Sequence, residues 1–238
     1  MKKLEFEIAG IPALLVGEPS ERLYLYVHGK MGCKEEALDF AERACPAGYQ
    51  VLAIDLPGHG ARKNSPERLL PWVTVPELQA VYARMKSVWA HIRLYGVSIG
   101  AWLAMQALQA DAPEKTLLVS PVVDMERLIG DMMMWAGVSE RELAERSEIP
   151  TDFGEVLSWR YLTYVREHPV VWRVPTRILY GERDELTSFE TISAFAGRIG
   201  AELTVMPGGE HWFHTDEQMH FLDNWLTKRT DRKCCIKL

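Results

Sequence analysis

The sequence predicts an α/β protein with a mostly parallel, eight-stranded sheet, helices on both of its faces and a small helical cap. Short apolar runs alternate with longer amphipathic segments, and several runs are almost wholly apolar, as in parallel strands covered on both faces. This alternation is interrupted between Val122 and Val174, where three helical patterns follow one another without a convincing strand. Because 238 residues suit one large domain, we expect a single domain over residues 1–238 with a cap inserted at about 122–174.

The strands follow from runs of apolar, β-branched and aromatic residues bounded by turn residues. The expected strands are Leu4–Ile8, Ala13–Val16, Leu23–Val27, Val51–Asp55, Ile92–Tyr95, Thr116–Val119, Ile178–Tyr180 and Leu203–Val205. The first two runs are close together and favour an antiparallel hairpin at the edge of the sheet.

The helices follow from apolar residues at helical spacing between those runs. The expected helices of the main fold are Glu35–Cys45, Pro76–His91, Ile99–Ala110, Ser188–Ile199 and Glu217–Lys228. In the cap, the expected helices are Asp124–Ala136, Glu140–Ser147 and Glu155–Glu167.

Charge and composition exclude several classes of partner. The net charge is −6, and no basic block is interleaved with aromatic residues, so we expect no nucleic-acid partner. No apolar run is long enough to cross a bilayer, and the first residues alternate like a strand rather than a signal peptide. We therefore expect no membrane partner, while the oligomeric state stays open.

The four cysteines predict reduced thiols and a cytoplasmic location. Cys33 and Cys45 are far apart and show neither zinc nor redox spacing. Cys234 and Cys235 are adjacent in a polar tail, where Lys237 departs from the pattern of a prenylation site. The tail therefore does not guide the functional interpretation.

The stretch "GVSIG", residues 96–100, places Ser98 between two glycines where an apolar strand becomes a helix. A serine on such a tight turn has a strained backbone, and small residues on either side relieve the clashes. The turn would expose the hydroxyl at the carboxyl edge of the sheet, where open α/β sheets bind ligands. The pattern predicts that Ser98 is a nucleophile, and the alternative is a serine that caps the helix.

A serine nucleophile needs a base, and His211 in "VMPGGEHWFH" has the best position among the seven histidines. It follows the last expected strand through a glycine pair, so its loop returns to the carboxyl edge. His214 and His220 are competitors, but both fall at or inside the final helix. Of the others, only His28 lies on a strand-end loop of interest.

The base in turn needs an acidic partner that fixes its tautomer. In "ILYGERDELTS" a strand ends at Gly181 and Asp184 follows three residues later, which makes Asp184 the first choice. Asp124 also lies just past a strand and is the second choice. Asp55 in "AIDLPGHG" ends a strand as well, but it precedes the serine and is better suited to ordering its own turn.

Acyl transfer also requires hydrogen-bond donors for an oxyanion. One is expected to be the backbone N–H of Ile99, directly after the serine. The other is expected from "YVHGKMG", with the N–H of Lys30 as the choice and that of Met31 as the alternative. The glycines that flank these residues permit a close approach of the backbone.

These features resemble the α/β-hydrolase fold and family. The resemblance is carried by His28–Gly29, by "DLPGHG" at Asp55–Gly60, by the Gly96–Gly100 turn, and then by Asp184 and His211, and it spans nearly the whole chain. The chain is most similar to the small prolyl-oligopeptidase-like and dienelactone-hydrolase-like branches, although the latter usually carry cysteine where this chain has Ser98. The resemblance implies no metal and no organic cofactor, and leaves the substrate open.

The leading functional interpretation is a serine hydrolase that cleaves a small carboxylic ester or related acyl substrate through an acyl-enzyme on Ser98. An aminopeptidase-like amidase is the alternative, and would need a cap carboxylate such as Glu140 or Glu155 to hold the substrate amine. A third interpretation is a non-catalytic binding protein of the same fold.

Large apolar side chains in the cap suggest where the acyl group binds. Met132, Met133, Met134 and Trp135 follow one another on one expected helix, so a single face cannot bury them all. Packing inside the cap is one interpretation, and a flexible pocket above Ser98 is the other. The candidate pocket residues are Met31, Met133, Trp135, Trp159 and Trp212.

Overall fold

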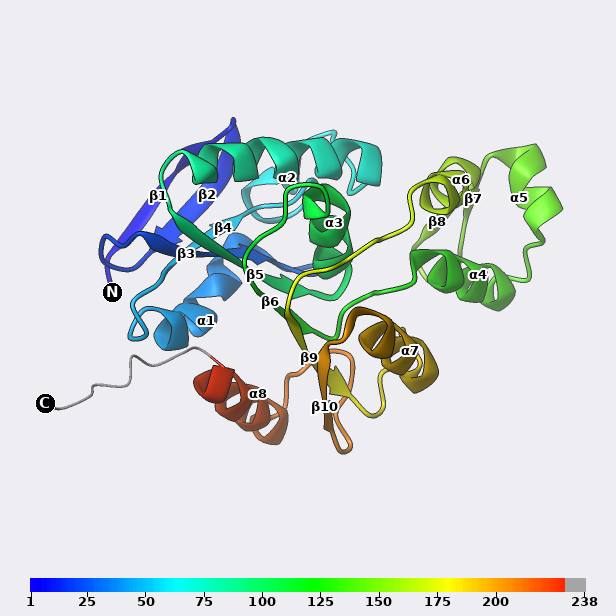
Figure 1. Cartoon of the computed structure of the whole chain (residues 1–238). Helices are drawn as coiled ribbons and strands as arrows, with labels where there is room; N and C mark the ends of the chain where they lie inside the picture. The colour runs from blue at the N-terminus through cyan, green and yellow to red at the C-terminus, as the bar shows by residue number, and fades with distance from the viewer. Residues whose placement is uncertain (230–238) are drawn as a thin grey trace, which may run out of the picture.

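The main sheet of the computed structural model has eight strands in the order β1-β2-β4-β3-β5-β6-β9-β10 (Figure 1). The structure describes residues 1–229, so Cys234 and Cys235 lie outside the described residues. The strands are β1 Lys3–Ile8, β2 Ile11–Val16, β3 Arg22–Val27, β4 Gln50–Ile54, β5 His91–Val97, β6 Thr116–Val119, β9 Thr176–Gly181 and β10 Glu202–Met206. All eight predicted strands are present, and the mostly parallel eight-stranded sheet is confirmed.

The two edge strands β1 and β2 form the predicted antiparallel hairpin, in which Ile8 pairs with Ile11. Ala9 and Gly10 make the two-residue turn, and both have positive φ angles of 53° and 77°, as a type I′ hairpin turn requires. Strand β2 is also antiparallel to β4, and every other pairing in this sheet is parallel.

Helices cover both faces of the sheet and enclose two separate cores. Helices α1 (Ala37–Ala44) and α8 (Asp216–Arg229) pack on one face, and α2 (Pro71–Lys86), α3 (Ser98–Leu108) and α7 (Phe189–Ile199) pack on the other. The alternation of side chains along β3 supplies both cores, with Leu23, Leu25 and Val27 in one and Tyr24 and Tyr26 in the other. Two short 3₁₀ helices, η1 (Lys34–Glu36) and η2 (Gly60–Arg62), lie in the loops after β3 and β4.

The helices of the predicted cap lie between β6 and β9 and project beyond the sheet on the right of Figure 1. They are α4 (Met125–Trp135), α5 (Glu140–Arg146) and α6 (Trp159–Glu167). A two-stranded antiparallel sheet of β7 (Glu148–Pro150) and β8 (Val156–Ser158) stands between α5 and α6. We refer to α4–α6 with β7 and β8 as the cap segment.

Two predicted helices have wrong boundaries. The third helix of the cap segment begins at Trp159 rather than Glu155, because Val156–Ser158 pairs as a strand and the Ser158 hydroxyl then accepts from the Tyr161 N–H. Strands of three residues are too short for a periodic pattern to reveal.

Helix α2 begins at Pro71, five residues before the predicted start, and ends at Lys86 instead of His91. Pro71 is the first residue of the helix, a position that suits proline because its missing N–H has no partner there, and Pro76 lies inside the helix.

Within residues 1–229, no helix is long and apolar enough to cross a membrane. Cys33 and Cys45 are both free thiols in this part of the chain.

Candidate active site

Ser98 lies on a sharp turn between β5 and α3, as the glycine spacing predicts. Its φ angle is +50°, a conformation that is strained for any residue other than glycine. A Cβ atom at Gly96 would lie 2.8 Å from the Cα atom of Ala101, and one at Gly100 would lie 2.0 Å from the carbonyl oxygen of His28. Both positions therefore require glycine, and the turn holds Ser98 at the carboxyl end of β5.

His211 and Asp184 complete a continuous chain of hydrogen bonds with this serine. The Ser98 Oγ lies 2.8 Å from His211 Nε2, and His211 Nδ1 lies 2.7 Å from Asp184 Oδ2. The carboxylate can only accept, so His211 carries its proton on Nδ1 and its Nε2 accepts from the serine hydroxyl. In sequence, His211 is 113 residues from Ser98 and 27 residues from Asp184, so only the fold brings the three side chains together.

Asp184 is held in place by backbone donors of its own loop. Its side chain is fully buried, and Oδ1 accepts from the N–H groups of Leu186 at 2.9 Å and Thr187 at 3.0 Å. These bonds leave Oδ2 to face His211. The Asp184 carboxylate is therefore held in place independently of its hydrogen bond to His211.

The loops that carry Asp184 and His211 are also joined to each other. The Glu182 carboxylate accepts from the Gly208 N–H at 2.7 Å, and the Arg183 N–H donates to the Gly209 carbonyl at 2.7 Å. A Cβ atom at Gly181 would lie 2.4 Å from the carbonyl oxygen of Glu210. The ends of β9 and β10 thus hold the acid and the base in a fixed relative position.

The competing histidines and acids take other positions. Asp124 is the N-cap of α4, and its carboxylate accepts from the Arg127 N–H at 2.9 Å. His214 lies 3.4 Å from Glu210, and His220 is an exposed residue of α8. Within the described residues, the hydrogen-bond partner of the Ser98 hydroxyl is His211 rather than any of these three.

A tight turn after β3 lies against the serine and presents the candidate oxyanion donors. The Gly32 N–H donates to the Gly29 carbonyl at 3.2 Å, which makes Lys30 and Met31 the two central residues, and Met31 has a φ angle of +65°. The central N–H groups of such a turn have no acceptor within it. A Cβ atom at Gly29 would lie 3.2 Å from the Cβ atom of Ser98, so the turn and the serine are in close contact.

The N–H of Ile99, the second residue of α3, also has no acceptor within its own helix, because it belongs to the first turn. The predicted donors at Ile99 and Lys30 therefore both lie beside Ser98. The geometry leaves Met31 as an alternative to Lys30.

His28 fixes the start of this turn in a buried, neutral state. Its Nε2 accepts from the Leu56 N–H at 3.1 Å, and its Nδ1 donates to the Gly29 carbonyl at 2.7 Å. Burial lowers the pKa of His28 from 6.5 to about 4. A protonated ring would have no lone pair left to accept from Leu56.

A buried ion pair that the sequence did not reveal supports the same region. Asp55 is fully buried, and its two oxygens accept from the Lys34 Nζ and N–H, both at 2.9 Å. Burial alone would lower the pKa of Lys34, but hydrogen bonds to Glu35 and Asp55 outweigh it and raise the pKa. Asp55 therefore orders its own turn, as predicted, and also anchors η1.

The cap segment reaches the candidate oxyanion turn through an ion pair between Glu155 and Lys30. Both side chains are partly exposed, and burial lowers the pKa of Lys30. Glu140, the other carboxylate considered for a substrate amine, pairs with Arg166 inside the cap segment at 2.6 Å.

The candidate pocket residues occupy different environments. Met133 is buried in the core with 8% of its surface exposed, which fits packing inside the cap segment. Trp159 is partly buried against the same core. Met31, Trp135 and Trp212 are exposed, and Trp212 stacks on His214 at a ring-centroid distance of 4.6 Å.

No group of three or more His, Cys, Asp or Glu side chains that could hold a metal ion occurs within residues 1–229.

The comparison with protein families agrees with the fold. Residues 25–222 match the model described as the alpha/beta hydrolase family. The chain belongs to the alpha/beta hydrolase family. As in the resemblance drawn from the sequence, the match includes the turn at Ser98 and the loops that carry Asp184 and His211.

Solved structures similar to this alpha/beta hydrolase include esterases. Est1E from Butyrivibrio proteoclasticus with bound ferulic acid has 20% sequence identity and a TM-score of 0.73, and the match covers 94% of this chain and 96% of that one. Mouse alpha/beta hydrolase domain-containing protein 10 has 15% identity and a TM-score of 0.71, with 96% and 98% covered. The Pyrococcus furiosus esterase Pf2001 has 19% identity and a TM-score of 0.64, with 96% and 90% covered. A search of curated proteins gave no match.

Proposed function

We propose that this alpha/beta hydrolase is a carboxylesterase-like serine hydrolase that cleaves a small carboxylic ester or related acyl substrate. The observation that carries the proposal is the hydrogen-bonded chain from Ser98 through His211 to the buried Asp184. A serine hydroxyl is a weak nucleophile at neutral pH, and this chain supplies the base and the acid that orients it.

In the proposed reaction, His211 Nε2 takes the hydroxyl proton as Ser98 Oγ attacks the substrate carbonyl carbon. The carbonyl oxygen becomes negatively charged and accepts from the N–H groups of Ile99 and of Lys30 or Met31. The imidazolium then gives its proton to the leaving alcohol, and an acyl-enzyme remains on Ser98. Water, deprotonated by His211, attacks the acyl carbon and releases the acid, and the proton returns to Ser98.

The ion pairs of the cap segment favour an uncharged ester over an aminopeptidase-like substrate. An amine substrate would need a carboxylate, yet Glu155 is paired with Lys30 and Glu140 with Arg166. A substrate amine would have to displace one of these cations. The hydrogen-bonded chain also supports catalysis over a role as a non-catalytic binding protein.

Similar solved structures support an ester as the substrate, and the ligand of one of them suggests an acyl group to test. Esterases are among these neighbours, and one of them, Est1E, was solved with ferulic acid, an aromatic carboxylic acid. The exposed Met31, Trp135 and Trp212 would suit an apolar or aromatic acyl group. We therefore propose these three residues, rather than the buried Met133, as contacts for the acyl group.

The test is a panel of substrates, assayed on the wild type and on Ser98→Ala, in which the aliphatic esters share one leaving group. The panel contains 4-nitrophenyl esters from acetate to octanoate, an aryl-acrylate ester, a thioester and an aminoacyl 4-nitroanilide. We expect kcat/KM to rise along the aliphatic series, by up to ~0.8 kcal/mol of transition-state binding for each methylene buried. Turnover of the anilide alone, or of no substrate at all, would contradict the proposal.

A further inference from the structure

One peptide group joins the turn that carries Ser98 to the loop that carries Asp184. It is the peptide between Pro121 and Val122, which follows β6. Its N–H, on Val122, donates to the Ser98 carbonyl at 3.1 Å. Its C=O, on Pro121, accepts from the Thr187 hydroxyl at 3.4 Å. Because a trans peptide is planar and rigid, these two bonds fix the turn and the loop relative to each other.

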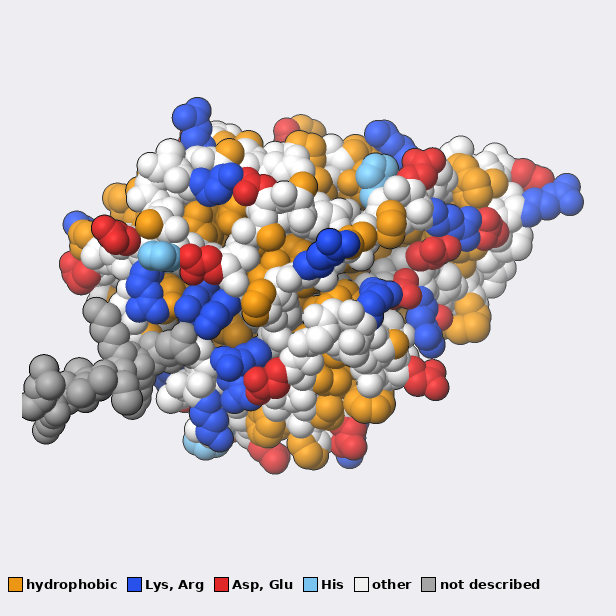
Figure 2. Space-filling view, viewed as in Figure 1, with side chains coloured by type: hydrophobic (Ala, Val, Ile, Leu, Met, Phe, Trp, Pro, Cys, Tyr) orange, Lys and Arg blue, Asp and Glu red, His pale blue; other side chains and the backbone are white. Residues whose placement is uncertain are grey.

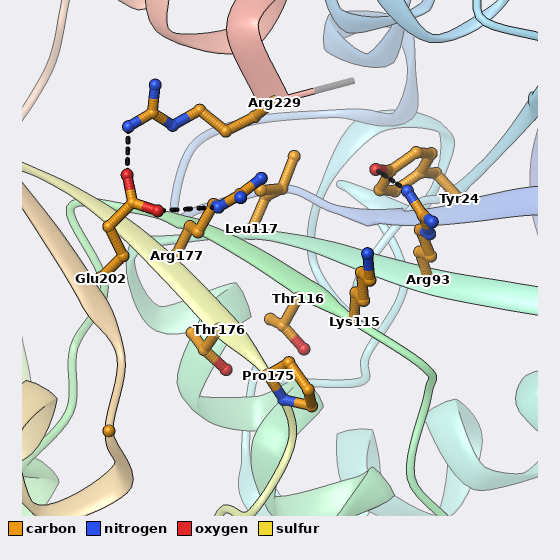
Figure 3. A pocket seen from close by; sticks show the side chains of 11 residues that line it. Tyr24, Arg93, Lys115, Thr116, Leu117, Pro175, Thr176, Arg177, Glu202 and Arg229 are labelled. Atoms are coloured by element: carbon orange, nitrogen blue, oxygen red, sulfur yellow. Dashed lines mark hydrogen bonds and ion pairs between the residues drawn. The ribbon is translucent and has the colours of Figure 1, made fainter. Parts of the chain in front are cut away.

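The pairing of β6 with β9 brings this peptide to the carboxyl edge of the sheet. The two strands are parallel, with Thr116 opposite Thr176 at the amino ends, which Figure 3 shows. Beyond the other end of β6, the Ser120 N–H donates to the Leu179 carbonyl at 2.8 Å. The chain therefore leaves β6 beside the stretch of β9 that leads into the Asp184 loop.

Thr187 uses all three of its polar groups in this region. Its N–H donates to Asp184 Oδ1 at 3.0 Å, and its hydroxyl donates to the Pro121 carbonyl. Its own carbonyl accepts from the Tyr180 hydroxyl at 2.8 Å. Thr187 therefore connects the acid both to the side chain of a β9 residue and to the peptide that contacts Ser98.

These contacts close the hydrogen-bonded chain of the candidate site into a ring. The ring runs from Ser98 through His211 to Asp184. It continues through Thr187 and returns to Ser98 through the Pro121–Val122 peptide. The first half carries the proton in the proposed reaction, and the second half holds the nucleophile and the acid at a fixed separation.

The second half of the ring lies inside the protein. Figure 2 shows acidic and basic side chains spread over the face seen in Figure 1, whereas Pro121, Val122 and Thr187 are buried. Hydrogen bonds are stronger where water is excluded, and a buried polar group without a partner is costly. Ser120, just before this peptide, has a φ angle of +43° and a buried hydroxyl with no hydrogen-bond partner within residues 1–229. Such strained positions persist where the surrounding structure holds them, and they are typical of functional sites.

We propose that Thr187 is a positioning residue of the candidate active site, which acts through Asp184. The inference rests on the proposed function, because it concerns the same reaction. Thr187 contacts the acid rather than the reacting atoms, and its hydroxyl holds the acid loop against the turn at Ser98. Loss of this hold misplaces Asp184 while His211 takes and returns the proton, so it lowers kcat more than it changes substrate binding.

The experiment compares three variants of the full chain. Thr187→Val removes the hydroxyl at nearly constant volume, and Thr187→Ser keeps it. Thr116→Val makes the same change at a buried threonine of β6 whose hydroxyl has no hydrogen-bond partner among the described residues. With a 4-nitrophenyl ester as substrate, Thr187→Val should lower kcat about tenfold and change KM by less than about twofold. Thr187→Ser and Thr116→Val should behave as the wild type.

Proton NMR gives a readout that does not depend on the substrate. The proton on His211 Nδ1, which is hydrogen-bonded to a carboxylate, is expected downfield of the amide protons, and its loss in His211→Gln checks the assignment. This signal should shift or broaden in Thr187→Val and stay in place in Thr187→Ser. Tyr180→Phe removes the bond to the Thr187 carbonyl and should have the same effect, so it replaces Thr187→Val if that variant does not fold.

Unchanged kcat and an unchanged proton signal in Thr187→Val and Tyr180→Phe would overturn the inference. Equal losses of kcat in Thr187→Ser or in Thr116→Val would also overturn it, because the hydroxyl of Thr187 would then not be responsible. If the signal responds as expected but the wild type hydrolyses no ester, the proposed function fails and the positioning of Asp184 by Thr187 stands.

Discussion

At the scale of single residues, the candidate site depends on the Asp184 carboxylate, one oxygen of which is hydrogen-bonded to His211. Asp184 has no solvent contact at its side chain, and its second oxygen is already bonded to two backbone N–H groups. It can therefore stabilise a positive charge on His211 without rearranging. Asp124, by contrast, satisfies the first turn of a helix.

The two aspartates give a matched pair of variants. Asp184→Asn should lower kcat by roughly 10⁴, the loss known from the corresponding change in serine proteases, because the amide disfavours the required tautomer of His211. Asp124→Asn should change kcat and stability little, since asparagine is as good an N-cap as aspartate. Steady-state kinetics and circular dichroism of both variants check this, and a reversed order of effects would transfer the acid to α4.

His28 makes the stability of the protein depend on pH. Its pKa in the folded protein is about 4 against 6.5 ordinarily, so the unfolded chain binds the proton more readily. The neutral His28 ring therefore contributes to the free energy of unfolding. This contribution is fully present above pH 6.5 and is lost as the pH falls toward 4, by roughly 3 kcal/mol in all. Urea unfolding at several pH values should show this slope in the wild type and a shallower one in His28→Gln; equal slopes would refute the role of His28.

Sequence reasoning could select Ser98, His211 and Asp184, which the structure brings together, because each follows a recognisable strand and parallel strands bring their carboxyl ends to one edge. It could not find contacts between residues that no pattern connects. Lys34 and Asp55 are 21 residues apart, and Lys30 and Glu155 are 125 apart. Neither lysine stands in a motif that indicates burial or pairing, so only the folded chain reveals these ion pairs.

At the scale of elements, the close approach of α3 to the end of β3 fixes the geometry of the site. The contact is made at Gly100, where any side chain would collide with the backbone of His28. Periodicity identified both elements, but it misplaced α2 and α6, because Pro71 and a three-residue strand determine where those helices begin.

Alanine substitutions at two helical glycines distinguish the tight contact at Gly100 from the general effect of glycine on helix stability. Gly100→Ala should destabilise the protein by about 3 kcal/mol, because backbone rather than a flexible side chain must move. Gly197→Ala in α7, where a Cβ atom meets nothing within 4 Å, should instead stabilise it by roughly 0.5 kcal/mol or more. Differential scanning calorimetry checks both, and similar shifts for the two variants would contradict a specific contact at Gly100.

At the scale of the whole molecule, one sheet presents two chemically different edges. The carboxyl edge carries the hydrogen-bonded site at Ser98, and the amino edge carries a cavity whose described lining includes four basic residues and one carboxylate. The first could be predicted from sequence, because its residues stand in motifs. The second could not, because Arg93, Lys115, Arg177 and Arg229 are scattered along the chain and meet only through the strand order β5-β6-β9-β10.

The most direct test of the central claim is covalent labelling of the serine. We expect a fluorophosphonate to add once to the wild type, with the adduct on Ser98 in peptide mass spectrometry. Labelling and ester turnover should both be lost in Ser98→Ala, with kcat falling by as much as ~10⁶. An adduct on a different serine, or undiminished turnover by Ser98→Ala, would contradict the assignment of Ser98 as the nucleophile.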